Sequence, residues 1–107
     1  MTLAEFRRAL SRRTAPGGLS PELTALWWAA KGDWNKAHEL VMDASGQDAA
    51  WIHAYLHRFE GDLDNARYWY RRAGRTPATG PLEAEWDAIA TILLQAVSGN
   101  IMPRTKS

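Results

Sequence analysis

The sequence contains no cysteine, which excludes disulfide bonds, thiolate metal ligands and thiol nucleophiles. This absence is typical of proteins from reducing compartments and favours the cytoplasm. No stretch approaches the roughly 20 consecutive apolar residues that span a bilayer, and residues 1–8 lack the apolar core of a signal peptide. We therefore expect a cytoplasmic protein that is neither exported nor inserted in a membrane.

The sequence also lacks an excess of charge of either sign. The formal net charge is +1, which is too small for general attraction to nucleic acid or to an anionic membrane. A length of 107 residues with 46% apolar and 23% charged residues is typical of one globular domain. What the chain has in abundance is tryptophan, and six of them predict a core or a face built on aromatic anchors.

Residues 1–13 have the pattern of a basic amphipathic helix. Thr2 and Glu5 have the spacing of a capping box, and apolar residues recur at helical intervals behind them. The opposite face of this predicted helix is basic, and its cationic residues are Arg7, Arg8, Arg12 and Arg13. The pattern favours a solvated face on a docked helix over a nucleic-acid contact.

Residues 20–45 and 48–74 predict two helical hairpins. Each contains a Gly-Asp pair, Gly32-Asp33 and Gly61-Asp62, in which glycine ends one helix and aspartate caps the next. An offset of 29 residues superposes these pairs and also matches the small residues of the flanking helices. Asp48 is the expected N-cap of the fourth helix, and the expected buried residues around the second turn are Ile52, Tyr55, Leu56, Phe59 and Leu63.

Residues 81–98 predict a C-terminal helix, and residues 99–107 predict a flexible tail. Glu83, Glu85 and Asp87 lie in its first turns, where acids stabilise the helix dipole. Apolar residues cover more than one side of this helix, so it needs covering on two sides. One cover is the preceding hairpin, and the other is the first helix or a second copy of the chain in a homodimer.

The predicted fold is all-α, with two antiparallel hairpins in a short right-handed stack, an N-terminal amphipathic helix and a C-terminal capping helix. The sequence from Ala66 to Ala73, ARYWYRRA, which follows Gly61-Asp62, resembles the second helix of Sel-one-like repeats. More broadly, both hairpins are similar to tetratricopeptide repeats. The resemblance implies a protein or peptide partner, and it assigns no catalytic residue.

The three histidines are candidate metal ligands. His53 and His57 stand four apart, so their imidazoles leave one face of the fourth helix. His38 on the preceding helix is the candidate third ligand, and Glu60 and Glu39 are further candidates. The alternative is that these histidines only hydrogen-bond across the interface between the hairpins.

The same histidines combine with Asp33, Asp62 or Tyr68 into a hypothetical acid and base set, because imidazole titrates near neutrality. Both aspartates are already assigned as helix caps. The sequence has no glycine-rich phosphate loop and no Gly-x-Ser-x-Gly string. We therefore expect no catalytic residues and no cofactor.

Arg67, Arg71 and Arg75 recur every fourth residue, with tyrosines between them. This spacing predicts a basic, aromatic stripe suited to an acidic peptide, a phosphate or single-stranded RNA. The alternative is a solvated face whose arginine stems cover tyrosine rings.

The sequence thus predicts a non-catalytic interaction module or adaptor whose partner is a protein or peptide, acidic in character, or a second copy. The metal or histidine-based site and RNA binding are the alternatives. The predicted binding face consists of Trp28, His53, His57, Arg67, Tyr68 and Arg71.

Overall fold

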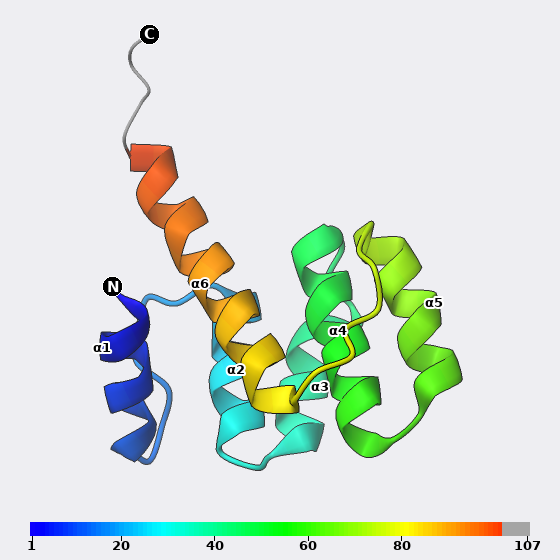
Figure 1. Cartoon of the computed structure of the whole chain (residues 1–107). Helices are drawn as coiled ribbons and strands as arrows, with labels where there is room; N and C mark the ends of the chain where they lie inside the picture. The colour runs from blue at the N-terminus through cyan, green and yellow to red at the C-terminus, as the bar shows by residue number, and fades with distance from the viewer. Residues whose placement is uncertain (102–107) are drawn as a thin grey trace, which may run out of the picture.

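The computed structural model describes residues 1–101, and within this part of the chain every regular element is helical (Figure 1). The elements are α1 (Leu3–Arg8), a 3₁₀ turn η1 (Ala9–Ser11), α2 (Pro21–Ala30), α3 (Trp34–Met42), α4 (Gln47–Glu60), α5 (Leu63–Ala73) and α6 (Leu82–Ile101). The prediction of an all-α hairpin protein is confirmed. Helix α6 continues past residue 98, and residues 102–107 of the predicted tail lie outside the described residues.

The two predicted Gly-Asp turns have the same backbone conformation. Gly32 and Gly61 have φ of +88° and +89°, a left-handed conformation that glycine adopts without steric cost. Asp33 and Asp62 follow at φ/ψ of −97°/79° and −91°/80°, and each carboxylate accepts a hydrogen bond from the backbone N–H three residues later. These short turns make α2–α3 and α4–α5 antiparallel pairs.

Helix α4 lies at the centre of the molecule and packs against α2, α3, α5 and α6. Every residue from position 49 to 57 is buried, so this helix is covered on all sides rather than along one stripe. The expectation that Phe59 and Leu63 are buried is wrong, because they flank the second turn and are 46% and 56% exposed. Asp48 is not the N-cap either, because α4 begins at Gln47 and is preceded by Gly46, which has no side chain to cap it.

The N-terminal segment docks on α2 and α6. Phe6 is fully buried and stacks on Trp86 at a ring distance of 5.5 Å. Trp27 Nε1 donates to the carbonyl of Ala9 at 3.2 Å, and Arg7 forms an ion pair with Asp87. The observed helix α1 is shorter than the helix predicted over residues 1–13, because the chain changes to a 3₁₀ turn after Arg8.

Helix α6 covers both hairpins with its N-terminal half. Its buried residues include Trp86 and Ile89, and Trp86 Nε1 donates to the carbonyl of Leu26 at 2.8 Å. Ile92, on another side of the helix, is 39% exposed. Among residues 1–101, no helix combines the length and the apolar character needed to cross a bilayer.

Candidate functional site

The structure brings the three histidines together where the two hairpins meet. His38 comes from α3, and His53 and His57 come from consecutive turns of α4. His38 Nε2 lies 2.9 Å from His53 Nε2, and one nitrogen of each imidazole lies within 4.8 Å of the others. The structure therefore brings together the three histidines that the sequence predicts as candidate ligands.

Aromatic rings form the walls of this histidine cluster, defined as His38, His53 and His57. Trp34 stacks on the His38 imidazole at a ring distance of 4.7 Å, and Trp69 stacks on that of His53 at 3.8 Å. His53 and His57 are 5% and 7% exposed, whereas His38 is half-buried. The cluster is thus closed on the α4 side and reachable on the α3 side.

The electrostatics of the cluster favour the neutral form of His38 and His53. Burial, followed by the neighbouring His38 and His57, lowers the pKa of His53 to about 4. Burial also lowers the pKa of His38, with the nearby His57 as the next cause. Neutral imidazole is the form that binds metals, because its unprotonated nitrogen carries the lone pair.

Two polar details distinguish the cluster from an ordinary set of buried side chains. His53 Nδ1 is buried and has no hydrogen-bond partner among the described residues. His57 Nδ1 lies 2.7 Å from Glu60 Oε2. Because a carboxylate only accepts, His57 donates its Nδ1 proton to Glu60, and the neutral tautomer with this bond has its lone pair on Nε2.

The hypothetical acid and base set is only partly assembled. Asp33 and Asp62 cap α3 and α5, in agreement with the sequence prediction. A carboxylate oxygen of Asp62 lies within 4.8 Å of ligand atoms of His57 and Glu60, so a second group, with two exposed carboxylates, overlaps the cluster at His57. The Tyr68 hydroxyl accepts a hydrogen bond from Arg72 on the outer side of α5.

The six residues of the predicted binding face do not lie on one surface. Trp28 belongs to α2, where it meets Trp27 edge-on and where Lys36 Nζ lies 4.5 Å from its ring centre. His53 and His57 are buried. The remaining members, Arg67, Tyr68 and Arg71, are exposed on α5, and α3 and α4 lie between α2 and α5 (Figure 1).

The predicted arginine stripe is shortened at its C-terminal end. Gly74 ends α5 with φ of +70°, which turns the chain away from the helix before Arg75. The Arg75 guanidinium then lies 3.5 Å from the ring centre of Trp51. Arg71 and Arg72 remain on α5, where their guanidinium groups lie 6.0 and 5.9 Å from the Tyr68 ring centre.

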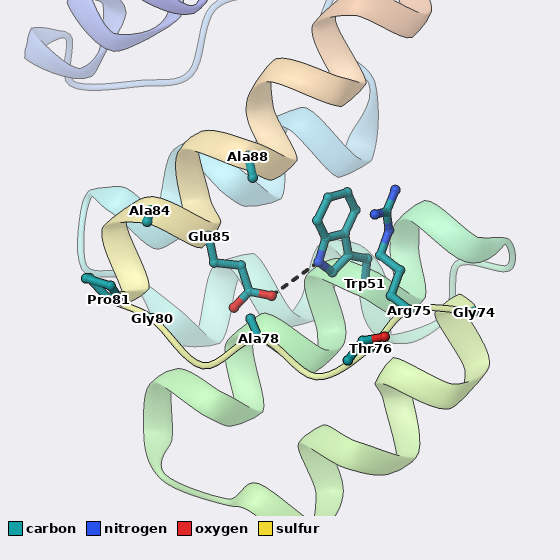
Figure 2. Close-up of a pocket in the computed structure, with 10 residues that line it drawn as sticks. All are labelled: Trp51, Gly74, Arg75, Thr76, Ala78, Gly80, Pro81, Ala84, Glu85 and Ala88. Atoms are coloured by element: carbon teal, nitrogen blue, oxygen red, sulfur yellow. Dashed lines mark hydrogen bonds between the residues drawn. The ribbon is translucent and has the colours of Figure 1, made fainter.

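A pocket of about 540 Å³ lies where α4, the end of α5 and the start of α6 meet (Figure 2). Its only buried charged side chain among the described residues is Glu85, which is 7% exposed. Glu85 accepts hydrogen bonds from Trp51 Nε1 at 3.2 Å, from the Tyr70 hydroxyl at 2.6 Å and from Arg58 at 2.9 Å. This carboxylate is therefore committed to holding the helices together.

Sequence reasoning identifies Glu85 only as a first-turn acid and misses its structural role. This role could have been sought from the sequence, because Trp51 and Tyr70 each carry a hydrogen-bond donor that needs an acceptor when the ring is buried. Burial raises the pKa of Tyr70, and its hydrogen bond to Glu85 raises it further. Burial also raises the pKa of Tyr55 to about 12, with Glu85 as the next cause, so both phenols stay protonated at neutral pH.

Comparison with known proteins does not extend this description. No family model, no curated protein and no solved structure shows significant similarity to the chain.

Proposed function

We propose that this chain is a non-catalytic, tetratricopeptide-like or Sel-one-like interaction module that binds an acidic amphipathic helix of a partner protein along α5. The proposal rests on a difference between α3 and α5, the second helices of the two hairpins. Helix α4 of the next hairpin packs on α3, whereas Leu63 and Arg67 of α5 are exposed. We place this interaction in the cytoplasm, which the lack of cysteine favours.

The alignment of the two hairpins supports α5 as the binding edge, by which we mean its exposed residues Leu63, Arg67, Tyr68 and Arg71. With the offset of 29 residues, Trp34 corresponds to Leu63 and His38 corresponds to Arg67. Trp34 and His38 both contact α4, the first helix of the next hairpin: Trp34 Nε1 donates to the carbonyl of Leu56 at 2.7 Å, and His38 meets His53. Leu63 and Arg67 are exposed instead, so α5 offers the edge on which a further helix would dock.

The chemistry of this edge favours an acidic partner. Arg67, Arg71 and Arg72 are exposed on α5 and outnumber the single acid within the helix, Asp64, which forms an ion pair with Arg67. Tyr68 is 41% exposed between the arginines and supplies apolar contact area. A helix with leucines on one side and glutamates beside them matches both properties.

Fluorescence anisotropy tests the proposal with a labelled amphipathic peptide of leucine and glutamate. The double variant Arg67→Glu/Arg71→Glu should bind this peptide at least about 10-fold more weakly, because two attractive charges become repulsive. A peptide with lysine in place of glutamate should bind weakly to the wild-type protein. Leu63→Asp should also weaken binding, since it places a charge in the apolar part of the edge.

The matched control is Arg12→Glu/Arg13→Glu, which makes the same change of charge on exposed residues of the N-terminal segment. Equal weakening by both double variants would show attraction to overall charge and would contradict a binding edge on α5. Stronger, salt-sensitive binding of a uridine oligonucleotide than of the acidic peptide would favour the RNA alternative. Sizing of the same samples tests the predicted homodimer through α6.

A further inference from the structure

The histidine cluster has three properties of a metal site that a simple hydrogen-bonded interface does not need. The first is convergence, since nitrogens of three imidazoles from two helices lie within 4.8 Å of one another. A tetrahedral zinc site with metal–nitrogen bonds of about 2.0–2.1 Å places its nitrogens roughly 3.4 Å apart. Small side-chain movements therefore convert the observed arrangement into coordination geometry.

The second property is support around the ligands. Trp34 and Trp69 stack on His38 and His53, and these stacks fix the planes of both rings. Glu60 accepts from His57 Nδ1, which fixes the tautomer and leaves Nε2 as the ligand atom. A carboxylate behind a metal-binding histidine is the usual outer-shell partner and raises the basicity of the imidazole.

The third property is a shortage of hydrogen-bond donors for the imidazole lone pairs of the cluster. His38 and His53 meet through Nε2 atoms, and only one proton can lie between these two nitrogens. Three packed imidazoles thus share few hydrogen bonds, and a cation between them gives their lone pairs a common partner.

We propose that His38, His53 and His57 bind one divalent transition-metal ion through their imidazole nitrogens. Imidazole ligands suit zinc, nickel, copper and cobalt, whereas calcium and magnesium take oxygen ligands. Three protein ligands leave a fourth position for water on the half-buried His38 side. None of the three ligands lies on α5, and the site goes beyond the proposed function.

Metal titration of the full chain, produced without a polyhistidine tag and stripped with EDTA, tests the site. One equivalent of Co²⁺ should bind saturably and give the visible absorption of tetrahedral cobalt. One equivalent of Zn²⁺ should compete it away and raise the melting temperature by at least about 5 °C. Absence of saturable uptake of either ion would overturn the proposal.

Three variants locate the ion. His38→Gln removes a half-buried ligand and should weaken metal affinity more than about 100-fold, with the fold checked by circular dichroism. Glu60→Gln should weaken it roughly 10–100-fold, as expected for loss of an outer-shell partner. Asp62→Asn keeps the helix cap, because asparagine caps as well as aspartate, and should leave the affinity unchanged.

The last variant separates the histidine cluster from the overlapping group of His57, Glu60 and Asp62. Metal binding that survives His38→Gln but is lost in Asp62→Asn would place the ion in the exposed group and refute the proposal. None of these variants alters the α5 residues tested for peptide binding, so the two proposals fail independently.

Discussion

The two hairpins share a backbone turn but differ in how their buried polar groups are satisfied. Around the first hairpin, Trp27 and Trp86 donate to backbone carbonyls of Ala9 and Leu26. In the second, Trp51 and Tyr70 donate to a buried carboxylate, Glu85. The same helical arrangement is thus held by hydrogen bonds to backbone carbonyls on one side and by a side chain that also pairs with Arg58 on the other. The second hairpin should therefore be the more sensitive to removal of a charged side chain.

The largest effect should come from removing this carboxylate. Glu85→Ala leaves the Arg58 guanidinium, which is 13% exposed, without its ion-pair partner. It also leaves the Trp51 Nε1 and Tyr70 hydroxyl donors without their acceptor. Loss of one member of a buried ion pair costs about 3–5 kcal/mol of unfolding free energy. Urea unfolding at pH 7 measures this loss.

Glu83→Ala is the matched control, because Glu83 is exposed on the same helix turn. It should cost only about 0.5 kcal/mol, through the helix dipole. Similar losses for the two variants would contradict the structural role assigned to Glu85.

Acid should destabilise the metal-free protein through the histidine cluster. The pKa of His53 is about 4 in the folded chain against 6.5 for an unperturbed histidine, so the unfolded chain binds more protons between these pH values. The unfolding free energy is thus unaffected above pH 6.5 and falls by about 3 kcal/mol as the pH drops to 4. His38 from α3 and His57 from the next turn of α4 face this imidazole, and both lower its pKa further.

Urea unfolding at several pH values with EDTA present measures the slope. His53→Leu removes the titrating group while keeping an apolar side chain of similar size, so the acid dependence should become shallower. The first hairpin carries Thr24 at the equivalent position and has no group there that titrates. An unchanged slope in His53→Leu would assign the acid sensitivity to other groups.

The smallest effect tests what the hairpins have in common. Gly32→Ala and Gly61→Ala place a side chain at φ near +88°, where an added Cβ meets no other atom within 4 Å. The cost is conformational alone, about 1–2 kcal/mol for each variant, and should be equal in the two turns. Thermal unfolding compares them, with Gly17→Ala as a control that has neither positive φ nor crowding. Unequal costs would break the equivalence of the turns.

The hairpins could be predicted from the sequence because their signals are local. Glycine, aspartate and the small residues act within a few positions, so Gly61 and Asp62 could be assigned without knowledge of the rest of the chain. The exposure of Leu63 could not be predicted this way. Its equivalent, Trp34, is covered by the following hairpin, whereas the described residues after α5 form the single helix α6.

The candidate site could be predicted only in part, because some of its contacts are local in the sequence and others depend on how the helices pack. The spacing of His53 and His57 places both on one helix face, which is a local property. Their meeting with His38 depends on how α3 crosses α4, and the support from Trp69 depends on α5. The role of Glu85 depends on donors 15 to 34 residues away in the chain, a distance over which periodicity carries no information.

The central position of α4 has a consequence for cooperativity. In long repeat arrays each unit contacts only its neighbours, so the ends can unfold separately. Here one helix packs against α2, α3, α5 and α6 together. Neither hairpin can lose its structure without exposing the apolar side chains of α4. The described part of the chain should therefore melt as a single unit, with its slowest-exchanging amides in α4.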